Sequence, residues 1–114
     1  MPTATFRNVV AGATTVENVL VGSQYEILTY PAEVFIGITQ DAGTIGDIVV
    51  TIYSGTDVLA EEQPISAANR IPLWPDDFPY NDIAAAMDRL KIKLRNTTAA
   101  TSRTVLTMLR LNPL

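Results

Sequence analysis

The residues nearest to a chemical site are the carboxylates that follow the most proline-rich segment of the chain. Asp76 and Asp77 stand side by side, and Asn81 and Asp82 come a few residues later. Carboxylate and amide oxygens are the ligands of hard cations such as calcium. The glycine-spaced register of a calcium loop is missing, and carboxylates in such segments commonly serve turns and caps. We therefore interpret these residues as structural and predict no metal site.

The same carboxylates are poor candidates for a general acid and base. Adjacent residues on an extended segment point apart, whereas hydrolytic carboxyl pairs face each other at roughly 5–9 Å. The sequence has no histidine and no cysteine, which removes the usual general base, the thiolate nucleophile and the usual zinc ligands. Its serines, such as Ser23 and Ser102, have no nucleophile context. We predict that the protein is not an enzyme and uses no cofactor.

Three aromatic residues belong to the same proline-rich segment. Trp74, the one tryptophan of the chain, is followed by Phe78 and Tyr80. Flat aromatic rings beside polar groups stack on sugar rings, so a carbohydrate-binding platform is one interpretation. Proline-rich aromatic segments more often close the end of a sandwich core or anchor an interface. We favour the second interpretation and expect contact, not catalysis, from these residues.

A basic strand face is the sharpest electrostatic feature. Arg89, Lys91, Lys93 and Arg95 alternate with aliphatic residues and so share one side of an expected strand. Such a face can contact nucleic-acid phosphates, but no aromatic residue is interleaved to stack on bases. Residues 1–69 carry one cation against eight anions, and the rest of the chain carries seven cations against four anions. A solvated face opposite the acidic half is therefore favoured over nucleic-acid binding, with docking onto an acidic neighbour as a third option.

Strand patterns run through most of the chain. Alternating or β-branched runs, separated by glycine, proline and asparagine, predict short strands. The expected strands are 3–11 (a loose strand or an arm), 16–21, 25–30, 33–40, 47–53, 58–63, 70–73 (brief), 89–96 and 103–111. Residues 54–57 have the composition of a hairpin turn. A single helical turn is expected near residues 82–87, where three alanines follow a capping residue.

The last expected strand is apolar on both of its faces. Val105 and Leu109 lie on one side, and Leu106 and Met108 lie on the other. Such a strand is central in a sandwich or lies at a subunit contact. We expect it to return beside residues 89–96 as a final hairpin.

The whole pattern predicts one all-β domain. Short strands with turns at roughly ten-residue spacing, and no long helix, indicate a single antiparallel β-sandwich or jelly-roll-like domain of seven or eight strands. A small Greek-key barrel is the runner-up. Residues 1–15 form an N-terminal strand or arm, and residues 16–114 form the sandwich. No apolar run approaches the roughly 18 residues that a membrane span needs, so we expect no membrane contact.

Several stretches resemble small proteins of environmental tailed bacteriophages. They are residues 65–78 (ISAANRIPLWPDDF), 84–90 (AAAMDRL), 53–62 (YSGTDVLAEE), 95–98 (RNTT) and 109–113 (LRLNP). The resemblance covers residues 20–114 and concerns strands and turns, without a catalytic signature. It implies a non-enzymatic structural protein of the virion, above all a capsid decoration (cement) protein. Such a protein is made in the host cytoplasm and ends on the capsid surface.

The partners implied by the resemblance are further copies of the chain and a major capsid protein. The expected oligomer is a homo-oligomer, with a trimer as one option. From the residues themselves, the expected protein-interface positions are Trp74, Phe78, Tyr80, Arg89, Lys91, Lys93, Arg95, Leu109 and Leu111. The alternatives are a carbohydrate-binding module of a tail fibre or spike, and a nucleic-acid-binding β-domain that uses the basic strand face.

Overall fold

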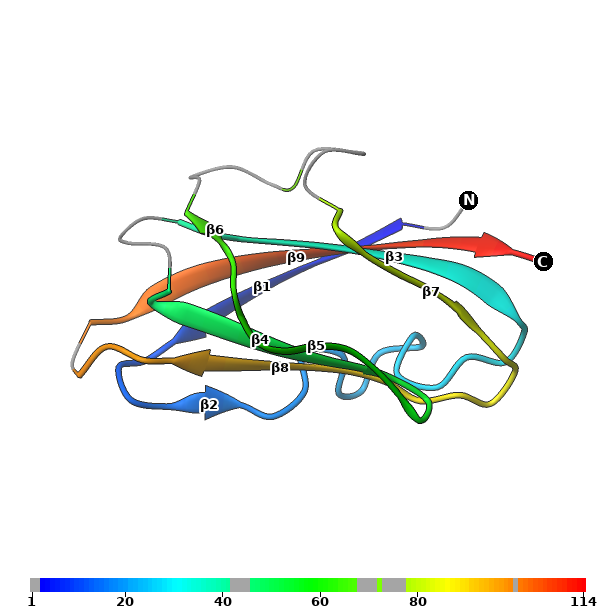
Figure 1. The fold of residues 1–114 in the computed structure, drawn as a ribbon, viewed down its shortest axis with the longest axis horizontal. Helices are drawn as coiled ribbons and strands as arrows, with labels where there is room; N and C mark the ends of the chain where they lie inside the picture. Colours follow the sequence, from blue (N-terminus) through cyan, green and yellow to red (C-terminus); the bar gives the residue numbers. More distant parts are fainter. Residues whose placement is uncertain (1–2, 42–45, 68–71, 73–77, 100) are drawn as a thin grey trace.

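The computed structural model describes residues 3–41, 46–67, 72, 78–99 and 101–114, and these form two β-sheets without a helix (Figure 1). The strands are β1 (Thr3–Val10), β2 (Thr15–Val16), β3 (Ala32–Gln40), β4 (Ile48–Ser54), β5 (Asp57–Pro64), β6 (Ser66–Ala67), β7 (Tyr80–Ala84), β8 (Leu90–Asn96) and β9 (Arg103–Pro113). Sheet A has the order β1, β9, β3, with β6 and β7 both on the far side of β3, and sheet B has the order β2, β8, β4, β5. Strand neighbours are antiparallel, apart from the short parallel pair of β3 and β6. The predicted all-β sandwich is confirmed.

The core is built from one face of each sheet. Val34 and Ile36 of β3 point inward from sheet A, and Ile92 and Leu94 of β8 point inward from sheet B; all four are fully buried. Burying an aliphatic side chain of this size stabilises the fold by about 1.5–3 kcal/mol. Along each strand, the residues that alternate with these inward residues face outward. The alternation by which these strands are predicted therefore corresponds to the division between core and surface.

The last strand is central in its sheet, which is one of the two positions predicted for a strand that is apolar on both faces. β9 lies between β1 and β3 and pairs with both along most of its length. Its inward residues include Val105 and Leu109, which are buried, while Leu106 and Met108 on the other face are half-buried.

The predicted hairpin at residues 54–57 is confirmed. Ser54 pairs with Asp57, and the two residues between them form the turn that joins β4 to β5. Gly55 has a φ of +61°, a left-handed conformation that favours glycine and suits a two-residue hairpin loop.

The predicted helical turn near residues 82–87 is wrong. β7 runs extended to Ala84 and pairs with β3, setting Ala84 opposite Ala32. A turn follows, in which Met87 has a φ of +72°. Alanine favours a helix, but one turn is too short to offset the cost of helix nucleation. The edge of β3 offers backbone partners to these residues instead.

The predicted strands at 16–21 and 25–30 are also wrong, since β2 covers only two residues and turns follow it. The N–H of Leu20 donates to Asn18 Oδ1 at 3.0 Å, and the N–H of Ser23 donates to the Leu20 carbonyl at 2.9 Å. These local hydrogen bonds replace the backbone hydrogen bonds that a strand would make to a neighbouring strand. Leu20 and Leu28 are nevertheless buried, so the apolar residues of this segment fill the core from a loop.

The predicted final hairpin is wrong as well. β8 lies in sheet B, whereas β9 lies in sheet A. The loop between them therefore crosses from one sheet to the other. Both strands carry the alternation of a half-buried strand, and that alternation does not specify which sheet a strand joins.

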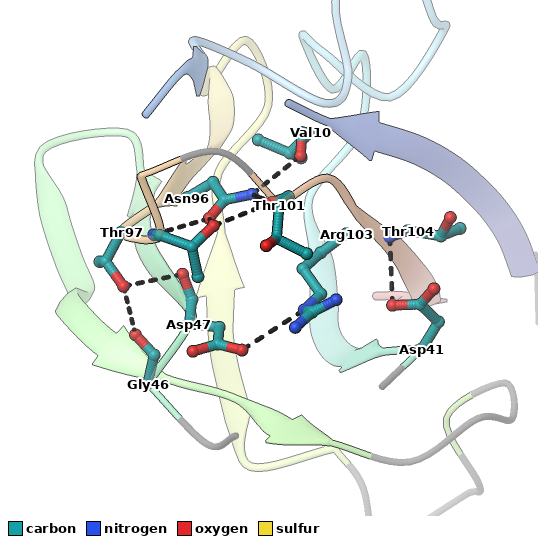
Figure 2. A network of polar contacts seen from close by, with 10 residues as sticks. Val10, Asp41, Gly46, Asp47, Asn96, Thr97, Thr101, Arg103 and Thr104 are labelled. Carbon is teal, nitrogen blue, oxygen red and sulfur yellow. Dashed lines mark hydrogen bonds and ion pairs between the residues drawn. The ribbon is translucent and has the colours of Figure 1, made fainter. Parts of the chain in front are cut away.

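Asn96 fixes this crossing from the inside (Figure 2). Its side chain is buried, and its Nδ2 donates to the carbonyls of Val10 at 2.9 Å and Thr101 at 2.8 Å. Its Oδ1 accepts the N–H and the hydroxyl of Thr98 at 2.9 and 2.6 Å. One amide side chain therefore joins the end of β1 to the loop that connects the two sheets.

Further contacts fasten the same end of the sandwich (Figure 2). The N–H and the hydroxyl of Thr97 donate to the Asp47 carbonyl at 2.7 and 3.0 Å. Arg103 Nε donates to Asp47 Oδ2 at 3.3 Å. Asp41 and Thr104 exchange two bonds: the Asp41 N–H donates to the Thr104 carbonyl at 2.8 Å, and the Thr104 N–H donates to Asp41 Oδ1 at 3.2 Å. These polar groups satisfy one another, which marks the network as structural.

The proline-rich segment lies mostly outside the described residues. Of the brief strand expected at 70–73 only Pro72 is described, and the side chain of Trp74 falls outside the described residues. The strands on either side of the segment, β6 and β7, both lie against β3 in sheet A. The chain has therefore already crossed from sheet B between Pro64 and Ser66, before the segment begins.

Thr107 tests how the core tolerates a polar atom. It is fully buried on the core face of β9, and its hydroxyl has no hydrogen-bond partner. A buried unpartnered hydroxyl costs about 1–3 kcal/mol, and valine has nearly the same shape. We expect Thr107→Val to raise the free energy of unfolding by about 1 kcal/mol, measured by urea denaturation followed by far-UV circular dichroism.

Thr51→Val is the matched control. Thr51 of β4 is also buried, but its Oγ1 accepts the N–H of Glu62 at 3.2 Å. Removing this acceptor should lower the free energy of unfolding by about 1 kcal/mol. Effects of the same sign in the two variants would contradict the distinction between a satisfied and an orphaned hydroxyl.

Candidate interaction surfaces

The outer face of sheet B carries the predicted basic strand face. Alternate residues of β8 are fully buried, so Lys91, Lys93 and Arg95 between them point outward. The register sets Lys91 beside Tyr53 of β4. Arg89, one residue before β8, is exposed at the end of the same row.

Two of these cations have carboxylate partners from the acidic part of the chain. Lys93 Nζ lies 3.9 Å from Glu17 Oε2. Arg95 donates through Nη2 to Glu62 Oε2 at 3.1 Å and through Nε to both oxygens at 3.2 Å. Glu17 follows β2 and Glu62 belongs to β5. In the strand order of sheet B these two carboxylates therefore lie on either side of β8. The charge asymmetry of the sequence is therefore at least partly neutralised within one fold.

The exposure of these ion pairs predicts different strengths. The Arg95–Glu62 side chains are 46% and 50% exposed, whereas those of Arg103 and Asp47 are 20% and 19% exposed. Alanine double-mutant cycles should give a coupling of about 0.5 kcal/mol for the first pair and about 1 kcal/mol for the second. Near 1 M salt the first coupling should vanish and the second should persist. A larger coupling at the exposed pair would contradict this order.

A shallow depression of about 260 Å³ lies at one end of the basic face, lined by Tyr53, Gly55, Arg89 and Lys91. Lys91 Nζ is 5.9 Å from the centroid of the Tyr53 ring, a cation–π distance. Two cationic side chains suit the depression to a carboxylate or another small anion. The ring itself is already covered by Lys91, which makes it a poor stacking platform for a sugar or a base.

The outer face of sheet A has the opposite character. Leu106 and Met108 of β9 point outward and are half-buried. Phe35 of β3 lies on the same face and is half-buried, while Val9 of β1 and Ile83 of β7 are 58% and 65% exposed. We call these five residues the apolar face.

The register brings the five residues of the apolar face near one another, with Arg7, Glu33 and Arg110 on the same side of sheet A. Val9 is the diagonal neighbour of Leu106, and Met108 is the diagonal neighbour of Phe35. Phe35 is in turn diagonal to Ile83. Diagonal neighbours lie about 7–8 Å apart, within reach of large side chains. The apolar residues therefore extend across sheet A from β1 to β7, interspersed with the three charged residues. The sequence signal of the apolar face was the two-sided last strand, whereas Val9 and Ile83 join it only through strand pairing.

The predicted interface residues divide between the core and the surface. Phe78, Leu109 and Leu111 are buried, which gives them a role in the core. Tyr80 is half-buried against the core, and this burial raises the pKa of its phenol above the ordinary value of 10.0. Trp74 lies outside the described residues. Because β7 belongs to sheet A and β8 to sheet B, Tyr80 and the basic residues lie on different sheets.

The acidic residues considered for chemistry are not gathered into a site by the described part of the chain. Asn81 and Asp82 belong to β7, and Asp76 and Asp77 lie outside the described residues. Among the residues that the structure describes, no three or more acidic, histidine or cysteine side chains form a group that could hold a metal ion. These same residues form no helix long and apolar enough to cross a membrane.

Comparison with protein-family models gives no match, and comparison with curated proteins gives none either. A β-sandwich hosts many unrelated functions, so the fold does not choose among them. The two outer faces therefore have to be interpreted from their own chemistry.

Proposed function

We propose that this protein is a non-enzymatic structural protein of a bacteriophage virion, a capsid decoration protein that associates with copies of itself and with a major capsid protein. The observation that carries the proposal is the apolar face, which leaves large hydrophobic side chains on the outside of a filled sandwich. Large apolar side chains gathered on an outer face and bordered by charged residues are typical of protein–protein contact. The resemblance to small phage proteins supplies the class of partner.

The difference between the two outer faces suits a protein that lies on a larger surface. The apolar face presents Val9 and Ile83 to a partner, whereas the outer face of sheet B carries solvated ion pairs such as Arg95–Glu62. A decoration protein needs one face for the shell and one for water, and it needs chemistry on neither. We therefore assign the shell contact to the apolar face.

Neither alternative function gains support from the geometry. A sugar-binding platform needs exposed aromatic rings, but Phe78 is buried and Tyr80 packs against the core. For nucleic-acid binding, Lys93 and Arg95 would have to leave their carboxylate partners before they could neutralise phosphates.

Co-sedimentation with empty capsid shells of the encoding phage tests the proposal. We expect saturable binding by the wild-type chain, and a loss of at least about tenfold in affinity for Met108→Glu, because the new carboxylate would have to be desolvated at the contact. Val49→Glu is the matched control, since Val49 is half-buried on the outer face of sheet B. It should bind as the wild type does.

The oligomeric state, measured by sedimentation equilibrium, completes the test. A strict monomer that binds no shell would refute the proposed function. Equal losses of binding from Met108→Glu and Val49→Glu would refute the assignment of the shell contact to the apolar face.

A further inference from the structure

We propose that two copies of this chain pair through β1, antiparallel to each other, so that their sheets A merge into one continuous sheet. This inference rests on the proposed function, because it names the contact by which copies associate. It uses the backbone edge of sheet A, whereas the shell contact uses the outer face of that sheet.

β1 is the terminal strand of sheet A in the described part of the chain. Its residues Thr3–Val10 pair with β9 one by one, without a register shift. In the part of the chain that the structure describes, β1 stands at the end of sheet A with β9 as its one strand neighbour. Every second residue of such a strand directs its N–H and C=O away from the sheet. That row of groups is a template for another strand.

The long edge of sheet B is protected in ways that β1 is not. β5 ends in Pro64, which has no N–H to donate, and its pairing with β4 contains register shifts. It also carries Glu61 and Glu62, both exposed. β1 has no proline and no bulge, and Arg7 is its one charged residue. Proteins usually block an exposed edge by these devices, and β1 has only Arg7 of them, so β1 is the less protected edge and the better template for a second strand.

The sequence of β1 fits a second β1. Residues directly opposite each other in an antiparallel pair share a face of the sheet. Two registers keep the core-side residues aligned over most of the strand, one pairing residues 3–9 of both copies and the other pairing residues 4–10. The second register sets Arg7 opposite Arg7, and like charges in that position oppose pairing. The first register sets Phe6 opposite Phe6 and Thr5 opposite Arg7, so we assign the contact to it.

This register covers side chains that the single chain leaves at the surface. Phe6 is half-buried and packs against the core of its own chain, and an aromatic pair across the two-fold axis stabilises adjacent strands. Val9, which is 58% exposed, comes to lie opposite Thr3 of the second copy. A second copy therefore satisfies both the backbone and the side chains of the edge.

Single-cysteine variants test the register, because the natural chain has no cysteine. Thr5→Cys, Phe6→Cys and Arg7→Cys are each oxidised mildly and separated on a non-reducing gel. A disulfide needs Cα atoms about 4.4–6.8 Å apart, so only Phe6→Cys should give a covalent dimer in high yield. Cross-linking at Arg7→Cys instead, or at none of the three positions, would overturn the proposal.

A charge exchange tests the same contact without touching the core. Thr5 is exposed in the single chain, so Thr5→Lys should leave the fold intact while placing an ammonium opposite Arg7 of the second copy. We expect the dimer dissociation constant to rise about tenfold, since two symmetry-related like-charge pairs oppose pairing. Adding Arg7→Glu should restore the dimer. A loss that this second change does not rescue contradicts the register.

The oligomeric state and shell binding together separate this inference from the proposed function. A wild-type chain that is monomeric or trimeric but binds the shell through the apolar face overturns β1 pairing alone. A dimer that binds no shell overturns the proposed function and leaves β1 pairing in place. A monomer that binds no shell overturns both.

Discussion

Replacing Asn96 with alanine is expected to lower the free energy of unfolding by about 2 kcal/mol, because it leaves the buried Val10 carbonyl without its side-chain donor and removes one of the two donors to the Thr101 carbonyl. Both carbonyls accept from Asn96 Nδ2, Val10 at 2.9 Å and Thr101 at 2.8 Å, and the Thr101 carbonyl also accepts from the Thr98 hydroxyl at 2.8 Å. An unsatisfied buried polar group costs about 1–3 kcal/mol. The variant also removes the oxygen that accepts two bonds from Thr98. Urea unfolding followed by far-UV circular dichroism measures the loss.

Two further variants separate the hydrogen bonds of Asn96 from its size. Asn96→Asp keeps the shape but removes the Nδ2 donor, so at neutral pH it should destabilise the fold nearly as much as alanine does. Asn112→Ala is the control, because Asn112 is half-buried and donates to Glu33 Oε1 at 3.1 Å. It should cost no more than about 1 kcal/mol. An Asn96→Asp variant as stable as the wild type would show that the crossing does not depend on these bonds.

The strands that could be predicted from the sequence are those with one face in the core. Their expected ranges, 33–40, 47–53, 58–63, 89–96 and 103–111, match β3, β4, β5, β8 and β9 to within two residues at each end. Most of these strands are covered on one side only, which forces a two-residue alternation of apolar and polar residues. That signal is local, and it does not depend on which strand is the partner.

The errors arose where a distant partner decides the local structure. Residues 82–84 follow a helix propensity in isolation, but the edge of β3 pairs with them. Leu20 and Leu28 suggested strand faces, but they fill the core from turns held by Asn18 and Ser23. The prediction of a final hairpin was wrong for the same reason, since alternation does not indicate which sheet a strand joins.

The candidate surfaces divide in the same way. The outward direction of Lys93 and Arg95 followed from alternation alone. Their partners Glu17 and Glu62 are far away in the sequence, so the neutralisation of the basic face needed the fold. The apolar face was visible in Leu106 and Met108 of the last strand, but its extent depends on the register of sheet A.

Replacing Gly55 with alanine is expected to cost about 2 kcal/mol, from two separate causes. Gly55 has a φ of +61° at the tip of the β4–β5 hairpin, and a left-handed conformation costs an L-residue about 1 kcal/mol or more. A Cβ at this position would also lie 2.9 Å from Cγ and 3.0 Å from Oδ2 of Asp88. That carboxylate accepts the N–H of Ala85 at 2.9 Å, so displacing it weakens a hydrogen bond worth about 1 kcal/mol.

Gly22 and Asp88 separate the two causes. Gly22 has a φ of +78°, but a Cβ there meets nothing within 4 Å, so Gly22→Ala should show the backbone cost alone, about 1 kcal/mol. In an Asp88→Ala background the collision is gone, and Gly55→Ala should then also cost about 1 kcal/mol. Urea unfolding of the four-variant cycle measures the coupling. A cost that is the same in both backgrounds would show that Asp88 does not restrict the hairpin. A coupling near 1 kcal/mol would show that the hairpin tip and the turn before β8 stabilise each other. This contact would also fix the positions of Arg89 and Lys91, which line the shallow depression on the outer face of sheet B.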